Sequence, residues 1–169
     1  MTSESSLTAP APRVPPARRE ATPLGAARPE IVFRRNRHIR FSDCDPAGIV
    51  FYPQYFVMLN DLVEAWFSDG LGIAYPDLVV RRRIGLPSVR LEVDFTAVSR
   101  MGDEVELALG VERLGGASLT LAHTITGSGG ERRMAMRQVL VSTALDTHRA
   151  VELPSDVRAA IARLLPAAS

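Results

Sequence analysis

The sequence predicts an α+β protein, in which a curved antiparallel sheet wraps around one long central helix. Two observations lead to this fold class. Between positions 53 and 69, apolar residues recur at steps of three and four, which is the period of an amphipathic helix. In the second half of the chain apolar and polar residues alternate, which is the period of strands with one buried face. That face needs a partner, and residues 53–69 form the long apolar helix that can supply it.

Composition and charge describe a single globular domain. The chain has 169 residues, of which 46% are hydrophobic and 23% charged, so it is long enough for one core. Its net charge of +1 argues against a nucleic-acid partner, and no apolar run has the length of a membrane span. The single cysteine, Cys44, excludes an internal disulfide and suits a reducing compartment. We therefore expect a cytoplasmic protein that binds neither nucleic acid nor membrane.

Residues 1–30 differ from the rest of the chain. They contain six of the 12 prolines, and apart from Met1 and Val14 their only large apolar residues are Leu7 and Leu24. Such a segment buries too little surface to offset the entropy that it would lose on ordering. The sequence therefore predicts a disordered Pro/Ala/Arg-rich tail over 1–30 and a folded domain over 31–169.

The first half of the domain is expected to hold one strand and the long helix. Residues 31–42 are rich in β-branched and aromatic side chains, which favours a strand ending at Ser42. Pro53 follows at a position where the first turn of a helix tolerates proline, and Gly70 and Gly72 end the helix. Residues 71–87 are expected to form a connecting loop with at most one short helix.

The second half of the chain is expected to form four consecutive antiparallel strands. They are predicted over residues 90–98, 105–111, 117–126 and 132–145. Glycine-rich turns at 114–116 and 127–130 separate the last three. A short C-terminal helix follows Pro154, with Ser155 as its predicted N-cap.

Chemistry-bearing residues gather in the stretch RFSDCDPAGIVFYPQYF, between the first strand and the helix. The usual nucleophile-elbow, phosphate-loop, zinc-helix and dinucleotide motifs are absent, and one cysteine with three scattered histidines argues against a metal site. This leaves carboxylates as candidate catalytic groups. Asp43 and Asp45 occupy alternate positions, so they point the same way if strand geometry persists. Pro46 holds Asp45 extended, and Gly48 permits a sharp bend and a close approach of ligand to the backbone.

The start of the helix supplies the second half of a candidate site. Amides near Phe51 and Tyr52 have no intrahelical acceptor, and the helix dipole adds partial positive charge there. A carboxylate that faces such donors can carry out acyl transfer, because the donors stabilise an oxyanion while the carboxylate attacks a carbonyl or activates water. The same spacing also fits a plain helix cap, which is the commoner use of an aspartate before a helix.

The stretch FSDCDPAGIVFYPQYF, followed by an amphipathic helix and four strands, resembles the 4-hydroxybenzoyl-CoA thioesterase family of hotdog folds over about residues 33–154. The resemblance implies a hydrolase that converts an acyl-CoA thioester to free acid and coenzyme A, without a further cofactor. Asp45 matches the family's catalytic carboxylate, and Tyr52 supplies the backbone N–H that polarises the thioester carbonyl. Gly48 and Ile49 lie beside them as expected substrate contacts.

Two positions depart from the branch of the family that has this motif. An aspartate of that branch holds the substrate's ring hydroxyl, and Asn60 stands at the matching position. An amide both donates and accepts hydrogen bonds, so we expect another ring substituent or ring position; a boundary residue without a role is the alternative. Where the branch has an arginine- and lysine-rich hairpin against the nucleotide phosphates, this chain has LGG and Ala117. Arg113 and Arg82 then become the candidates for binding coenzyme A, and a solvated charged loop is the alternative.

Several further expectations follow from the resemblance and the pattern. Family members form dimers or tetramers with active sites at subunit interfaces, so a homodimer or homotetramer is expected. The expected acyl group is a small aromatic one of the hydroxybenzoyl kind. A short-chain aliphatic acyl-CoA, an acyl carrier protein as donor, and a non-catalytic acyl-CoA-binding role are the alternatives. Glu64 ranks second to Asp45 as the carboxylate, Asp43 is expected to be structural, and His123 is expected to be a core histidine.

Overall fold

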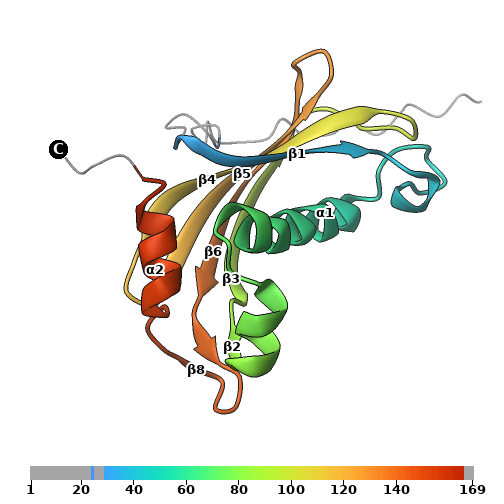
Figure 1. Ribbon diagram of the computed structural model, residues 1–169. Helices are drawn as coiled ribbons and strands as arrows, with labels where there is room; N and C mark the ends of the chain where they lie inside the picture. Colours follow the sequence, from blue (N-terminus) through green and yellow to red (C-terminus); the bar gives the residue numbers. More distant parts are fainter. Residues whose placement is uncertain (1–23, 25–28, 166–169) are drawn as a thin grey trace, which may run out of the picture.

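The computed structural model describes Leu24 and residues 29–165, so most of the predicted tail over 1–30 lies outside the described residues. An antiparallel sheet curves around one long helix, as Figure 1 shows. The predicted α+β class, with a curved sheet wrapped around a central helix, is therefore confirmed.

Five strands form the main sheet in the order β1-β4-β5-β6-β3, and every neighbouring pair is antiparallel. They are β1 (Ile31–His38), β3 (Ser88–Phe95), β4 (Glu104–Leu114), β5 (Ser118–Gly127) and β6 (Arg132–Val141). The two predicted glycine-rich turns join β4 to β5 and β5 to β6. A small second sheet holds β2 (Ile84–Gly85), β7 (Thr143–Ala144) and β8 (Arg149–Ala150), so the last predicted strand is divided between β6 and β7.

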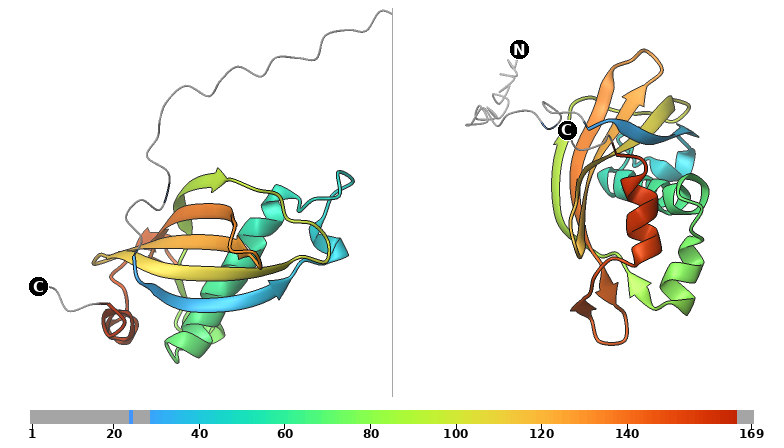
Figure 2. Two further views of the ribbon diagram at one scale, coloured as in Figure 1. Left: turned by 90° about the horizontal axis from the view of Figure 1, so that it is seen from above. Right: turned by 60° about the vertical axis from the view of Figure 1, so that its left-hand side comes forward.

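The helix α1 (Tyr52–Ala65) lies across the concave face of the main sheet, and Figure 2 shows it crossing the strands. Its apolar side packs against the inward-facing residues of the central strands. The largest fully buried side chains of this core include Met58, Leu59, Trp66, Phe67, Leu109, Leu119, Leu121, Ile125 and Met134. Burial of aliphatic and aromatic groups on this scale fixes the axis of α1 relative to the sheet, and with it the place where the helix begins.

The first strand is shorter than the sequence predicts. It ends at His38 rather than at Ser42, and residues Phe41–Asp43 form the 3-10 turn η1. The reason is local, because the carboxylate of Asp43 accepts the amide of Arg40 at 2.8 Å. A backbone donor that bonds to a nearby side chain is lost to the sheet ladder, so the strand cannot continue.

The long helix also changes before its predicted end. Regular α-helical hydrogen bonding ends at Ala65, and the chain widens into the π turn η2 (Trp66–Gly70). There the amide of Leu71 donates to the carbonyl of Trp66 at 2.9 Å, five residues back. The short helix expected in the following loop is the π turn η3 (Asp77–Arg81).

The C-terminal helix α2 (Ser155–Ala162) covers one end of the core with Val157 and Ile161. The prediction that Ser155 caps it is wrong, because Pro154 is the N-cap residue and Ser155 is the first helical residue. Among the described residues, no helix combines the length and the apolar character that crossing a membrane requires.

The edge strand β3 differs from the expected strand with one buried face. Leu91 and Phe95 were expected on that face, yet they are 44% and 50% exposed. Within the described chain β3 pairs only with β6, and α1 packs mainly on β4. Leu91 and Phe95 therefore stay partly open in a single subunit, although Val93 on the same face packs against the core and Phe95 contacts Tyr55 of α1.

The outer face of the sheet carries the start of the described chain. The amide of Leu24 donates to the carboxylate of Asp94 at 3.0 Å, and the guanidinium of Arg132 donates to the carbonyl of Leu24 at 3.2 Å. Gly110 permits a close crossing on β4, because a Cβ atom there would lie 2.8 Å from the carbonyl oxygen of Glu30.

Candidate active site

The stretch between β1 and α1 forms a narrow loop with a sharp bend at its tip. Gly48 adopts a left-handed conformation with φ of 76°, as its predicted role in a bend requires. Its amide donates to the carbonyl of Asp45 at 2.9 Å, and the amide of Asp45 donates to the carbonyl of Ile49 at 3.0 Å. Asp45, Gly48 and Ile49 therefore share one tight turn, with Gly48 exposed and Ile49 half-buried.

Backbone hydrogen bonds join the two ends of this loop next to the start of the helix α1. Cys44 and Val50 form an isolated β-bridge, and the amide of Phe51 donates to the carbonyl of Asp43 at 2.9 Å. Phe51 is the N-cap residue of α1. The loop that holds Asp45 is thus fastened directly to the start of the helix.

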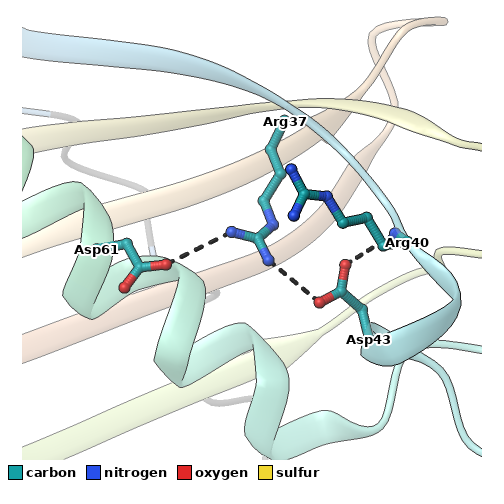
Figure 3. Close-up of polar contacts among 4 residues, drawn as sticks. All are labelled: Arg37, Arg40, Asp43 and Asp61. Carbon is teal, nitrogen blue, oxygen red and sulfur yellow. Dashed lines mark hydrogen bonds and ion pairs between the residues drawn. The ribbon is translucent and has the colours of Figure 1, made fainter.

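The two aspartates of the motif have different surroundings. Asp43 is 3% exposed and bonds to Arg37, whose guanidinium lies between Asp43 and Asp61 in Figure 3. Asp45 is half-buried, and its Oδ1 accepts the amide of Ala47 at 2.8 Å. Asp43 ends the turn η1, and only Cys44 between the two aspartates keeps an extended conformation. Asp43 takes the structural position expected of it.

The carboxylate of Asp45 keeps one oxygen available. Within the described part of the chain, only Oδ1 has a hydrogen-bond donor, and Oδ2 has none. A carboxylate that is oriented through one oxygen and open at the other is suited to attack a carbonyl or to accept a proton.

The helix start leaves one backbone donor unpaired. Phe51 and Tyr52 were both expected to have open amides, but the amide of Phe51 bonds to Asp43. Pro53 has no N–H, and the amide of Gln54 donates to the carbonyl of Phe51 at 2.8 Å. Among the described residues the amide of Tyr52 finds no acceptor, so the first turn of α1 presents this single donor, reinforced by the helix dipole.

Asn60 lies two turns further along α1, on its exposed side. It lines a cavity of about 340 Å³ together with Glu64, Tyr75, Ser88 and Gln138, and Asp45 is not part of that lining. Burial raises the pKa of Tyr75, and the nearby Glu64 carboxylate adds to the increase. The cavity therefore offers hydroxyl and amide groups between α1 and the edge of the sheet.

The two arginines expected to bind coenzyme A differ in whether they already pair with a carboxylate. Arg82 donates both terminal nitrogens to the carboxylate of Asp156 at 2.8 Å, which ties η3 to α2. This hydrogen bond raises the pKa of Arg82 and lowers the pKa of Asp156. Arg113 is exposed, and no carboxylate of the described chain pairs with it. A role for either residue in coenzyme A binding stays a prediction.

Comparison with known proteins identifies the family. Residues 39–161 match the model of the thioesterase-like superfamily. The chain belongs to this superfamily. It is 28% identical to 4-hydroxybenzoyl-CoA thioesterase of Pseudomonas sp. (strain CBS-3) over 127 residues, which are 71% of this chain and 90% of that protein. It is 24% identical to 1,4-dihydroxy-2-naphthoyl-CoA hydrolase of Synechocystis over 133 residues, which are 78% of this chain and 96% of that protein.

Solved structures agree with the family. The structure of 4-hydroxybenzoyl-CoA thioesterase from Pseudomonas sp. strain CBS-3 superimposes with a TM-score of 0.69 at 27% identity and covers 76% of this chain and 97% of that one. A gentisyl-coenzyme A thioesterase gives a TM-score of 0.69 at 25% identity, with coverage of 76% and 99%. The predicted hotdog fold and the predicted enzyme class, an acyl-CoA thioesterase, are confirmed.

This thioesterase-like protein also has a series of polar hydrogen bonds on its sheet, from buried His123 and Gln138 to exposed Ser88, that sequence reasoning did not identify. Nε2 of His123 lies 2.8 Å from Oε1 of Gln138, and Nε2 of Gln138 donates to Oγ of Ser88 at 2.7 Å. Gln138 interrupts the inward-facing series Met134, Met136 and Leu140, and that break in the apolar pattern was the available signal. Burial lowers the pKa of His123 to about 4, and the hydrogen bond to Gln138 opposes this only in part.

His123 is therefore neutral at pH 7, as a core histidine should be, although its Nδ1 is buried without a partner in the described part of the chain. Over the same part of the chain, no group of three or more histidine, cysteine, aspartate or glutamate residues is placed to hold a metal ion.

The low pKa of His123 makes the stability of this thioesterase sensitive to acid. The unfolded chain binds a proton at this residue near pH 6.5, whereas the folded chain binds it only near pH 4. Stability is therefore lost as the pH falls through this window, by about 2 kcal/mol between pH 7 and pH 5. Denaturant unfolding of the wild type and of His123→Leu at both pH values measures the effect. The variant should lose about 2 kcal/mol less than the wild type, and equal losses would show that His123 does not titrate in this way.

Proposed function

We propose that this thioesterase hydrolyses the coenzyme A thioester of a small aromatic acid, with Asp45 as its carboxylate and the amide of Tyr52 as its oxyanion donor. One observation carries the proposal. The first turn of α1 presents a single unpaired amide, and the loop fastened to that turn holds a carboxylate with one open oxygen. A hydrogen-bond donor for the carbonyl oxygen, and a carboxylate that attacks the carbonyl carbon or activates a water to do so, are the two groups that thioester hydrolysis needs.

The reaction follows from these two groups. The thioester carbonyl oxygen accepts the Tyr52 N–H, which stabilises negative charge on that oxygen as the carbonyl carbon becomes tetrahedral. The open oxygen of Asp45 then either attacks the carbonyl carbon, expelling the coenzyme A thiolate before water cleaves the anhydride, or removes a proton from an attacking water. Both routes consume one water and give the free acid and coenzyme A. The Ala47 amide holds the other oxygen of Asp45 throughout.

Exposed aromatic side chains at the helix start support an aromatic acyl group. Phe51 and Tyr52 are 45% and 59% exposed, and their rings meet edge to face at 5.4 Å between centroids. Phe95, 50% exposed, packs against Tyr55 at 5.8 Å. Aromatic rings favour such offset and edge contacts, so these surfaces suit a flat ring better than a flexible chain. The relatives named above act on hydroxybenzoyl and dihydroxynaphthoyl thioesters, which are aromatic.

Asn60 is the proposed contact for a polar substituent on the ring. Its amide can donate as well as accept, so it does not require a hydroxyl at one fixed ring position. The hydroxyl and amide groups of Ser88 and Gln138 line the same cavity as Asn60. The proposed substrates are therefore aryl thioesters with a hydrogen-bonding group on the ring.

Arg113 is the better candidate for the coenzyme A phosphates. Its guanidinium is exposed and has no carboxylate partner in the described chain, whereas Arg82 already binds Asp156 through two hydrogen bonds. A guanidinium committed to a bidentate pair would have to give up that pair to bind a phosphate.

A second copy of the chain is the proposed partner of strand β3. The strand has an unpaired edge in the described chain, and Val89, Leu91 and Phe95 leave 59%, 44% and 50% of their surfaces exposed beside it. An open apolar edge favours pairing with another strand. Because one strand lying antiparallel to its own copy generates a two-fold axis, the edge fits a homodimer, and pairs of such dimers would give a tetramer.

Replacement of Asp45 tests the proposed chemistry. Asp45→Asn keeps the shape and the hydrogen bond to Ala47 but removes the nucleophile, so kcat should fall by roughly two to four orders of magnitude. Release of free thiol is measured with 4-hydroxybenzoyl-CoA, benzoyl-CoA and butyryl-CoA. Tyr52→Phe is the matched control, because it preserves the backbone amide and should change kcat by less than about twofold.

The same assay separates the alternatives. Near-normal turnover in Asp45→Asn would remove the proposed mechanism, and a preference for butyryl-CoA over both aryl thioesters would remove the proposed substrate class. Thermal stabilisation of the wild type by these thioesters without any thiol release would indicate a binding protein.

Replacement of Asn60 tests the proposed substituent contact. Asn60→Asp introduces a charged acceptor for a ring hydroxyl, so kcat/KM for 4-hydroxybenzoyl-CoA relative to benzoyl-CoA should rise by about tenfold. The ratio of the two substrates is internal to each variant and cancels changes in folded protein. A ratio that stays within about twofold of the wild-type value would show that residue 60 does not contact the ring substituent.

Replacement of Leu91 tests the proposed dimer edge. Leu91→Asp places a charge on the open face of β3, so the wild-type oligomer should dissociate toward the 18.4 kDa chain in sedimentation experiments. Val80→Asp is the control, since Val80 is 70% exposed on η3, outside β3. An oligomer unaffected by Leu91→Asp, or a monomeric wild type, would contradict the proposed edge.

A further inference from the structure

Asp43 joins three parts of the chain around the candidate active site. Its Oδ2 accepts the Arg40 amide at 2.8 Å, and its Oδ1 accepts a terminal nitrogen of Arg37 at 3.1 Å. Its carbonyl accepts the amide of Phe51, the N-cap residue of α1. With its side chain 5% exposed, Asp43 is therefore bound at once to β1, to the turn η1 and to the start of the helix.

Both proposed catalytic groups lie close in the sequence to Asp43 or to its hydrogen-bond partner Phe51. Asp45 follows Asp43 after Cys44, and Tyr52 follows Phe51 directly. Any displacement of Asp43 moves the loop that holds the carboxylate and the turn that holds the amide. The position of Asp43 therefore helps to set the distance between the two groups, and a misplacement of about 1 Å is enough to reduce turnover about a hundredfold.

Arg37 supplies the charge that keeps Asp43 in place. A buried carboxylate needs a partner, and Arg37 is the only residue of the described chain that forms an ion pair with Asp43. The same guanidinium reaches Asp61 on α1 at 3.5 Å, so it also connects to the middle of the helix (Figure 3). Asp61 is 61% exposed, which makes this second arm the weaker one.

The Arg37 guanidinium lies between β1 and α1, in partly buried surroundings. It lines a cavity of about 360 Å³ between β1 and α1, and its side chain is 27% exposed. Its Nε is buried and has no hydrogen-bond partner among the described residues. The two carboxylates therefore fix the guanidinium in a place where one of its donors stays unpaired, which indicates that its position is set by Asp43 and Asp61.

We propose that Arg37 is a positioning residue for thioester hydrolysis, because its ion pair with Asp43 holds the Asp45 carboxylate in register with the Tyr52 amide. This inference rests on the proposed function. Arg37 touches neither reacting group and acts through Asp43. Its removal should therefore lower kcat and leave the affinity for a bound thioester nearly unchanged.

The test compares Arg37→Gln with Arg34→Gln, measured well below the unfolding temperature of each variant. Arg34 lies on the same strand and pairs with Glu106 at the surface, so its replacement is a matched control. For Arg37→Gln we expect kcat on the best aryl thioester to fall about tenfold to a hundredfold, with KM and the affinity for an unreactive thioether analogue within about threefold of wild type. Arg37→Lys should recover part of kcat, and Asp61→Asn should cost less than about threefold.

The decisive step is a double variant. In an Asp45→Asn background, Arg37→Gln should lower the residual rate by less than about twofold, because the carboxylate that Arg37 positions through Asp43 is then absent. A merely structural role would lower the active fraction equally in both backgrounds, and that result would overturn the proposal. An unchanged kcat in Arg37→Gln would overturn it as well.

The outcomes also distinguish this proposal from the proposed function. If the wild type turns over and Asp45→Asn does not, the function stands, and the Arg37 variants then decide the positioning role alone. A wild type that releases no thiol from any thioester would contradict the function itself, and the positioning role with it.

Discussion

The burial of one side of α1 in the curve of the sheet is the constraint on which the candidate site depends. Met58, Leu59 and Leu62 fix the helix axis, so its first turn has only one place to lie. A helix start always leaves amides without intrahelical acceptors. In this chain Phe51 bonds to Asp43 and Pro53 has no N–H, so the amide of Tyr52 remains. The fold thereby converts a general property of helix ends into one donor at a defined position.

The two acids of the motif show how surroundings separate similar residues. Only Cys44 separates Asp43 from Asp45 in the sequence. Asp43 is buried and forms an ion pair with Arg37, whereas Asp45 is half-buried and has one oxygen without a hydrogen bond in the described chain. A buried, paired carboxylate is costly to disturb and serves as an anchor. A carboxylate oriented through one oxygen can still react. One acid is thus suited to hold the loop, and the other is suited to the chemistry that we propose for it.

The sequence predicted the parts of this arrangement that depend on periodicity and backbone stereochemistry. The helix, the hairpin strands and the bend at Gly48 all follow from the spacing of apolar residues and glycines. It could not predict the partners of single polar groups. The end of β1 depends on Asp43 capturing the Arg40 amide, and nothing in the local pattern indicates this bond. The same holds for Arg82, whose partner Asp156 is 74 residues away.

The exposed face of β3 marks another limit of sequence patterns. Leu91 and Phe95 alternate with charged residues as in any half-buried strand, but the pattern does not say whether the cover comes from the same chain or from another copy. Here Val93 packs against the core and Phe95 contacts Tyr55 of α1, yet Leu91 and Phe95 stay 44% and 50% exposed. An alternating strand at a sheet edge is therefore an indication of assembly as much as of a core.

The most direct measurement of the central claim is a crystal structure with an unreactive ketone analogue of an aryl-CoA thioester, in which a methylene group replaces the sulfur. We expect the ketone oxygen about 3 Å from the Tyr52 amide nitrogen, and the open oxygen of Asp45 about 3–3.5 Å from the carbonyl carbon. A ketone bound with its oxygen turned away from Tyr52, or with its carbon out of reach of Asp45, would contradict the account.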